Sequence, residues 1–182
     1  MGTIAVHEFT TLDGVIETPT WTFDYPFDPR MGEAIGAIMG SSKAILLGRR
    51  TYEEFAPAWS ARTAAEDPGA PFMNETAKYV VSGSLTEADW NNSTVVGAYS
   101  AGAIRSLKDE IDGSIYVSGS GTLVRAMLAD GLVDDLHLFV FPLTLGDGRR
   151  LFPDGGLKAK LRLAGTNAYD SGVVHLHYQP AE

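Results

Sequence analysis

Runs of consecutive apolar residues alternate with amphipathic stretches along most of the chain. Residues 43–48, 77–86 and 115–119 include short runs that are apolar on both faces, which is typical of strands buried inside a parallel sheet. Residues 3–17 begin in the same way and predict another central strand. Between these runs the apolar residues take the spacing of helices. The pattern therefore predicts strands that alternate with helices.

Two segments have clear helical spacing. Residues 30–40 place their apolar side chains on one helical face, and residues 100–113 do the same with Ser100 as the N-cap. Thr51 and Glu54 have the spacing of a capping box, which predicts that a helix starts at Thr51. Each predicted helix follows or precedes a predicted buried strand, so the helices would cover a sheet.

The rest of the chain predicts one long loop and a strand-rich ending. Residues 56–76 are rich in Ala and Pro without periodicity, which indicates a long surface loop. Residues 134–146 predict a strand, and residues 160–178 predict two strands joined as a hairpin. Alternating strands and helices followed by strands favour an α/β sheet with an antiparallel edge. We expect a single domain over residues 1–182.

Composition and charge exclude several classes of protein. The formal net charge is −9, so the surface would repel nucleic acid and anionic membranes. The chain has no cysteine, which excludes disulfides, thiolate metal ligands and a cysteine nucleophile. No apolar run approaches the ~18 residues of a membrane span, and the N-terminus does not read as a signal peptide. We expect a cytoplasmic protein without nucleic-acid or membrane partners.

Residues 115–131 predict a strand, a glycine turn and a helix. The turn has Gly119 and Gly121 but Val124 in place of the third glycine of a dinucleotide-binding fingerprint, and it lacks the Gly-Lys-Ser/Thr of a P-loop. Free N–H groups of residues 120–123 at the helix start would still attract an anion. The alternative is a tight connection that binds nothing.

Two other strand ends carry residues suited to phosphate. Arg49 and Arg50 follow one buried strand, and Ser82 and Gly83 follow another. Arginine binds phosphate in a bidentate manner, and open α/β sheets bind ligands at the carboxyl ends of their strands. The three strand ends together favour one long anionic ligand. Taken separately, the arginines could be surface residues and Ser82 an ordinary turn residue.

The order of these motifs resembles the dihydrofolate reductase-like superfamily. The Gly-Arg-x-Thr-Tyr block at 48–52, the Gly-x-Gly turn at 119–121 and the block "PLTLGDGRRLF" at 142–152 are similar to the reductase domain of the riboflavin-biosynthesis deaminase–reductase. The resemblance implies a three-layer α/β fold, with a mostly parallel central sheet, an antiparallel C-terminal edge hairpin and flanking helices. It also implies an NADPH-dependent reductase of a small heterocycle, similar to 5-amino-6-(5-phosphoribosylamino)uracil reductase.

The resemblance also implies which residues bind NADPH. Ala5 and Val6 would face the nicotinamide, with Gly14 and Val15 in a loop that closes over it. The arginine pair with Ser82 would recognise the 2′-phosphate. The full implied set of cofactor-binding residues is Ala5, Val6, Gly14, Val15, Gly48, Arg49, Arg50, Thr51, Ser82, Gly83, Gly119, Ser120, Gly121, Thr122 and Leu123.

The substrate end is less clear in the sequence. The resemblance implies a carboxylate on the helix after the first strand, for which Asp28 and Glu33 are the candidates, although either could be a first-turn or exposed acid. Arg30 is the one arginine or lysine before Lys43, so a substrate phosphate has no evident partner. An orphan or cofactor-binding paralogue, a dihydrofolate reductase or a flavin-using reductase therefore stay open as alternatives.

The histidines give no metal prediction. His175 and His177 are two residues apart in a predicted strand and share a face, which could suit a metal ion. No third ligand can be identified from the sequence, and we predict no metal.

A homodimer is expected from the strand at 134–146. Leu136, Leu138 and Val140 alternate with Phe139 and Phe141, so both faces of the strand need cover. The phenylalanines, beside Leu143 and Leu145, would form an apolar patch large enough to mark an interface. The resembling family is usually dimeric, and a second copy would cover such a patch.

Overall fold

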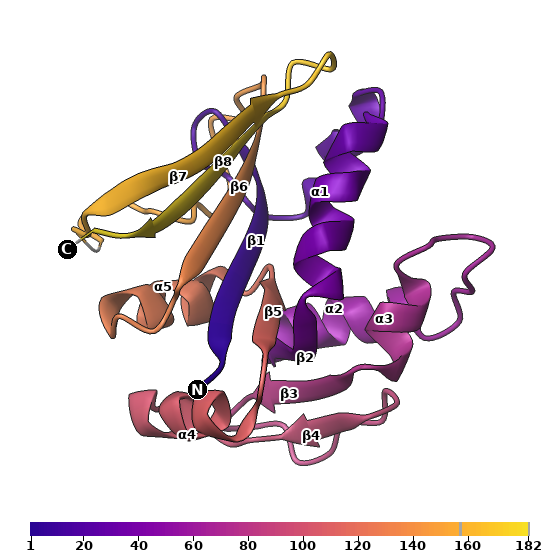
Figure 1. Ribbon diagram of the computed structural model, residues 1–182, viewed down its shortest axis with the longest axis vertical. Helices are drawn as coiled ribbons and strands as arrows, with labels where there is room; N and C mark the ends of the chain where they lie inside the picture. The colour runs from indigo at the N-terminus through magenta and orange to yellow at the C-terminus, as the bar shows by residue number, and fades with distance from the viewer. Residues whose placement is uncertain (157, 182) are drawn as a thin grey trace.

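The computed structural model describes residues 1–156 and 158–181, which form an eight-stranded sheet with helices on both faces (Figure 1). The strands are β1 (Thr3–Thr11), β2 (Ser42–Gly48), β3 (Ala77–Val81), β4 (Ser93–Val95), β5 (Ser114–Ser118), β6 (Asp135–Phe141), β7 (Leu161–Ala168) and β8 (Val174–Pro180). The helices are η1 (Pro19–Asp24), α1 (Pro29–Gly40), α2 (Arg49–Trp59), α3 (Ala70–Glu75), α4 (Ala101–Glu110) and α5 (Gly121–Ala129).

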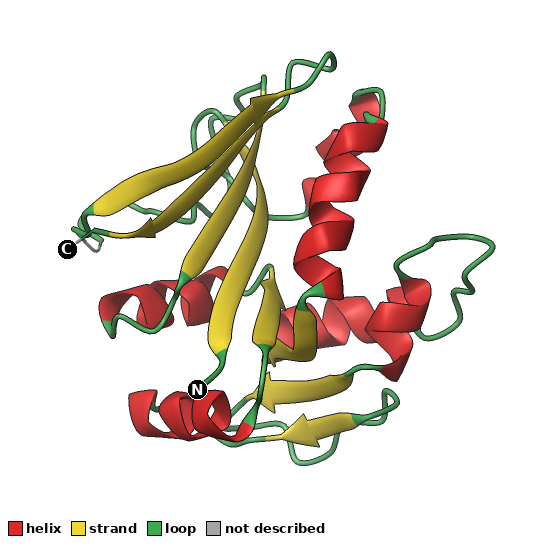
Figure 2. Cartoon of the chain, viewed as in Figure 1, coloured by secondary structure: helices red, strands yellow, loops and turns green. Residues whose placement is uncertain are grey.

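The sheet has the order β4-β3-β2-β5-β1-β6-β8-β7. The strands from β4 to β6 in this order are parallel, whereas β8 runs antiparallel to β6 and β7 antiparallel to β8. Figure 2 shows the helices on both sides of this twisted sheet. The predicted α/β fold with an antiparallel C-terminal hairpin is confirmed. None of the helices in the described ranges has the length and apolar character needed to cross a membrane.

Each face of the sheet carries its own hydrophobic core. On one face, called here the α5 face, α4 and α5 pack side chains such as Ile104 and Met127 against β1, β2, β5 and β6. On the other, called the α1 face, α1, α2, α3 and η1 contribute side chains such as Met31 and Trp21. Burial on both sides explains why the central strands are continuous apolar runs.

Two local predictions are wrong. Helix α2 begins at Arg49 with Gly48 as its N-cap, so Thr51 is not a cap but a buried residue of the first turn. The segment 56–76 is not one loop, because α2 continues to Trp59 and a second helix, α3, follows. Phe72 of α3 packs against the α1-face core. Tertiary packing therefore stabilises a helix that has no visible periodicity.

The prediction of an exposed apolar patch around Phe139 and Phe141 is also wrong. Both rings are buried within the chain, because Phe139 stacks on His175 and Phe141 packs against Trp21. Strand β6 lies between β1 and β8 rather than at an edge, which puts its α1 face under the chain's own aromatic residues. Within the C-terminal strands, the exposed large apolar side chain is Leu163 of β7, which lies on the α5 face.

Candidate functional site

Two turns meet at the carboxyl edge of the sheet. Strands β2 and β5 are neighbours, so the turn into α2 lies beside the turn into α5. The Ser120 hydroxyl accepts a hydrogen bond from the Gly48 N–H at 2.7 Å and donates one to Thr51 Oγ1 at 2.8 Å. We call residues 48–51 and 119–123 the cradle.

Neither helix of the cradle is capped by a side chain. Gly48 has none to offer, and the Ser120 side chain makes no capping hydrogen bond because it points toward β2. No acidic residue occupies the first turn of either helix. The first N–H groups of α2 and α5 therefore keep their partial positive charge for an external anion.

The cradle holds unusual backbone geometry. Ser120 is a non-glycine residue at φ 67°, a conformation that costs on the order of 1–3 kcal/mol and persists where neighbours enforce it. Gly119 has φ +66°, and a Cβ there would lie 3.2 Å from the Thr51 methyl group. A Cβ at Gly121 would lie 2.5 Å from Ile16 Cδ1. The glycines thus permit close approach of the turns and of the loop after β1.

The predicted phosphate-binding arginines lie at the rim of the cradle. Arg49 pairs with Glu53 at 3.0 Å, and Arg50 pairs with Glu17 at 3.0 Å and with Glu54 at 3.2 Å. The arginine side chains are each about half exposed. Both guanidinium groups are therefore close to the helix start but are bound to carboxylates.

Ser82 and Gly83 lie at the end of the next strand. Gly48 pairs with Val81 across β2 and β3, which places Ser82 beside the start of α2. The Ser82 hydroxyl accepts hydrogen bonds from the N–H groups of Ser84 (3.2 Å) and Leu85 (2.8 Å). Its side chain stabilises its own turn.

The loop that holds Gly14 and Val15 is fixed by contacts with residues 143–150. The Asp13 carboxylate accepts hydrogen bonds from the Thr11 hydroxyl at 2.5 Å and the Gly146 N–H at 2.8 Å, which lower its pKa to about 2. Val15 is buried and bridges to Arg150, while Gly14 takes φ +83°. Together with the Arg50–Glu17 pair, these contacts hold the loop beside the cradle.

The structure does not bring Ala5 and Val6 to the cradle. Ala5 faces α1 in the amino-terminal half of β1, whereas Val6 is fully buried on the α5 face. His7, not Ala5, pairs with Ser118 at the end of β5. Strand alternation sends the two side chains to opposite faces, so a contact of both residues with one nicotinamide ring would involve the β1 backbone, and this assignment stays a prediction.

Glu8 is a residue of this region that the sequence reasoning missed. It is 3% exposed, and its Oε1 atom has no hydrogen-bond partner among the described residues. Burial raises its pKa to about 8, although the Gly119 N–H and the charge of Arg125 oppose the shift. A carboxyl group that is neutral near pH 7 does not repel phosphate. The signal available in the sequence was a single acidic residue, Glu8, inside a predicted apolar strand.

The two predicted catalytic acids have different environments. Asp28 is buried at the N-cap of α1, where it binds the Arg30 N–H at 2.9 Å and the Arg30 guanidinium at 2.6 Å. The hydrogen bond from the Arg30 side chain lowers the pKa of Asp28 to about 2, so the group stays ionised. Glu33 is exposed on α1. Trp21 Nε1 and the Tyr169 hydroxyl, which are buried and have no hydrogen-bond partner among the described residues, belong to the same core as α1.

A cavity of about 680 Å³ lies on the α1 face, between α1 and the amino ends of β1, β5 and β6. His137 and His175, which line the cavity, and the neighbouring His7 are uncharged at neutral pH. Burial, helped by neighbouring histidines, lowers the pKa of His7 to about 3 and the pKa values of His137 and His175 to about 4. The lining residues include Ala5, Ala37, Ile38, Asp135, His137 and His175.

Comparison with known proteins places the chain in a family. The sequence model of the RibD C-terminal domain matches residues 3–175. The uncharacterized protein YyaP of Bacillus subtilis is 29% identical over 177 residues, covering 92% of this chain and 89% of YyaP. A putative riboflavin biosynthesis protein from Shewanella sp. PV-4 has a TM-score of 0.82 at 19% identity, with both chains fully covered.

A more distant structure has the same fold. Dihydrofolate reductase from Enterococcus faecalis, complexed with NADP(H) and RAB-propyl, has a TM-score of 0.63 at 14% identity, covering 100% of this chain and 98% of that one. The predicted resemblance is therefore confirmed at the level of family and fold. The chain belongs to the RibD C-terminal domain family.

Proposed function

We propose that the protein is an NADPH-dependent reductase of a small heterocycle. The observation that carries the proposal is the cradle, where two helix N-termini without side-chain caps meet through Ser120. The family supports a reductase, and the enterococcal dihydrofolate reductase of the same fold is complexed with NADP(H). The proposal includes a cytoplasmic location and a homodimer, which is argued below from the sheet surface.

The cradle residues fit a dinucleotide with three phosphate groups. The N–H groups of residues 121–123 would bind the pyrophosphate, as expected for a helix start. Arg49 and Arg50, with Ser82 beside them, would bind the 2′-phosphate in exchange for their present glutamate partners. Arginine binds phosphate in a bidentate manner, and the exposed arginine–glutamate pairs contribute little to stability, so the phosphate could replace the glutamates at small cost.

The chain itself would align the reactants and exclude water. Bound NADPH would supply a hydride to an electrophilic carbon of the substrate. On the α1 face, His7 and Tyr116 form a wall near the end of β5, joined by a hydrogen bond of 2.9 Å. The loop at residues 13–17 lies beside the cradle and would cover the reacting groups. Its position is held by Asp13 and Arg50.

Asp28 is the better of the two proposed carboxylates. It is buried and ionised beneath the start of α1, whereas Glu33 is exposed. We propose that Asp28 orients the heterocycle, and Asp28→Asn is the variant that tests it because Asn preserves the N-cap. Turnover should fall in Asp28→Asn and stay unchanged in Glu33→Gln. Equal turnover in both variants would remove Asp28 from the site.

The substrate class has two candidates. Family membership favours a ribosylamino-pyrimidine phosphate, the substrate type of the resembling uracil reductase. The charges favour a heterocycle without phosphate, because Arg30, which lies beside the proposed carboxylate Asp28, is bound by Asp28 and Asp170. Turnover of a panel of pyrimidines, pterins and their 5′-phosphates separates the two.

The decisive experiment is titration of the chain with NADPH, followed by turnover of the panel. We expect saturable NADPH binding with quenching of tryptophan fluorescence, and NADPH oxidation with at least one heterocycle. Absence of NADPH binding at millimolar concentration would overturn the reductase proposal. Binding without turnover of any compound would instead support the orphan paralogue.

A further inference from the structure

The sheet register assembles the chain's four histidines on one face. His7 pairs with His137 across β1 and β6, and His137 pairs with His177 across β6 and β8. His175 belongs to the same face, where its ring lies 5.2 Å from that of His137. Residues separated by up to 170 positions in the chain thus form one cluster.

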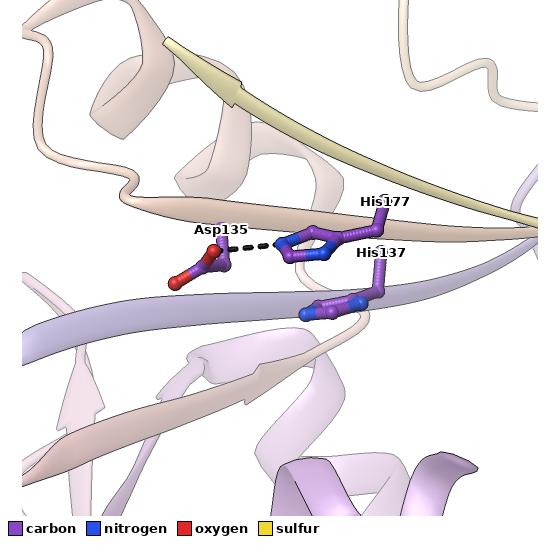
Figure 3. Close-up of side chains that lie close together, drawn as sticks. All are labelled: Asp135, His137 and His177. Carbon is purple, nitrogen blue, oxygen red and sulfur yellow. Dashed lines mark hydrogen bonds and ion pairs between the residues drawn. The ribbon is translucent and has the colours of Figure 1, made fainter. Parts of the chain in front are cut away.

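Three side chains of this cluster converge at one point. The rings of His137 and His177 stack with centroids 4.1 Å apart, and His177 Nε2 lies 2.7 Å from Asp135 Oδ1. Figure 3 shows both rings directed toward the Asp135 carboxylate. One ligand atom from each of the three residues lies within 4.8 Å of the others.

These groups have outer partners that hold them in place. Gln179 donates a hydrogen bond to Asp135 Oδ1 at 2.8 Å, and His137 Nδ1 lies 3.0 Å from His175 Nε2. With Nδ1 directed at His175, the Nε2 atom of His137 is left for another partner. Such second interactions are typical around metal-binding histidines and carboxylates, because they fix the ring orientation. The ligands also stand on paired strands, which are rigid supports.

The adjoining cavity favours a cation. Asp112 and Asp135 line it, and its lining residues include no lysine or arginine. The whole chain carries a net charge of −9. An anionic ligand would find no lysine or arginine side chain among these lining residues, whereas a cation would meet carboxylate and imidazole ligands.

We propose that Asp135, His137 and His177 bind a divalent first-row transition-metal ion of the Zn²⁺ type, with an open position toward the cavity. Two imidazoles and one carboxylate are a ligand set of open zinc and iron sites. With bonds of about 2.0–2.1 Å, ligand atoms of a tetrahedral site lie about 3.3 Å apart, so the Asp135–His177 contact would open by roughly 0.6 Å. The strand register thereby brings together three ligands that could not be identified from the sequence, from which we predicted no metal.

The test uses the full chain, without an affinity tag and after chelator treatment. We expect calorimetry to show one Zn²⁺ bound per chain, and Co²⁺ to give the visible d–d absorption of a low-coordinate site. His137→Gln and His177→Gln should each weaken binding by more than the roughly 10–100-fold expected for Gln179→Ala, which removes only an outer partner. Asp89→Asn, an exposed acid with no hydrogen bond among the described residues, serves as the matched control.

The outcomes separate a metal site from a hydrogen-bonded histidine cluster. Zn²⁺ should raise the unfolding temperature of the wild type and of Asp89→Asn, but not of the ligand variants. Zn²⁺ binding that persists unchanged in both histidine variants would overturn the proposal. So would a wild-type chain without Co²⁺ absorption bands, a result that needs no variant to fold. Neither result depends on NADPH or on the reductase proposal.

Discussion

The Ser120 side chain links turns that lie 72 positions apart in the chain. Its left-handed backbone and its bonds to Gly48 and Thr51 form one unit, since the hydroxyl can reach both partners only when it points away from its own helix. The same orientation leaves α5 without a side-chain cap. One residue therefore both joins the two turns and keeps the helix start available for an anion.

Glu8 predicts a dependence of stability on pH. Its pKa is about 8 in the folded chain and 4.5 in an unfolded one, so the folded state holds a proton that the unfolded state has released between these values. The stability contributed by this group is present below pH 4.5 and is lost as the pH rises through 8, with a slope of at most about 1.4 kcal/mol per pH unit. Glu8→Gln should remove this slope and make the variant more stable than the wild type at pH 8.

Urea unfolding at pH 5 and pH 8 measures the effect. The comparison with wild type at each pH isolates Glu8 from the histidines, which titrate in both chains. Glu110→Gln, an exposed acid of α4, is the control and should follow the wild type. An unchanged slope in Glu8→Gln would mean that the carboxyl group is already ionised in the folded chain.

Arg49 predicts nucleotide discrimination. Arg49→Ala should lower NADPH affinity roughly tenfold to hundredfold and leave NADH affinity nearly unchanged, because one charge-assisted contact to the 2′-phosphate is worth about 1.5–3 kcal/mol. Stability should not change, since the exposed Arg49–Glu53 pair contributes little. Fluorescence titration with both nucleotides measures the difference, with Arg105→Ala in α4 as control. Equal losses for NADPH and NADH would contradict the 2′-phosphate assignment.

At the scale of elements, the strands and helices could be predicted where periodicity is strong. The buried strands, α1 and α4 with its Ser100 cap follow the apolar pattern. The capping-box spacing does not predict the start of α2 correctly, because the Thr51 hydroxyl accepts a hydrogen bond from Ser120 of another turn. The short helix α3 depends on core packing rather than on its own residues. Contacts between distant segments therefore determine both the start of α2 and the formation of α3.

The turn before α5 predicts the effect of Gly121→Val. A Cβ at Gly121 would meet the flexible end of Ile16, so the added side chain should displace the loop after β1 and obstruct the pyrophosphate without unfolding the chain. We expect loss of NADPH binding with a preserved circular dichroism spectrum. Gly102→Val is the matched control, since Gly102 lies in α4 with open space around its Cβ position. Normal NADPH affinity in folded Gly121→Val would show that the turn serves only the fold.

At the scale of the whole molecule, register determines which residues meet. The sequence places the cradle residues and Ser82 at three strand ends, and parallel pairing of β5, β2 and β3 brings these ends to one edge. The histidine cluster could not be predicted in this way. Its members meet only because β6 lies between β1 and β8 in one particular register, which no local pattern specifies. Ala5 and Val6 lie on opposite faces of β1, and their assignment to the nicotinamide stays a prediction.

The α5 face of the C-terminal strands carries apolar side chains that the chain covers only in part. Leu138 and Val140 of β6 and Leu176 of β8 are only partly buried, and Leu163 of the edge strand β7 is 51% exposed. In the register of the hairpin these side chains lie on the same face. This surface replaces the phenylalanine patch as the proposed site of a second copy, because a twofold contact can cover a self-complementary apolar face.

Leu163→Glu should therefore dissociate the homodimer. A charge placed within an apolar interface would be buried without a partner, at a cost that exceeds the contribution of the lost contact. Sedimentation at micromolar concentration should give twice the 19.5 kDa chain mass for the wild type and the chain mass itself for Leu163→Glu. Leu145→Glu, at an exposed apolar residue outside the sheet strands, should stay dimeric. A wild-type chain that sediments as a monomer would refute the dimer, and a dimer that survives Leu163→Glu would place the interface elsewhere.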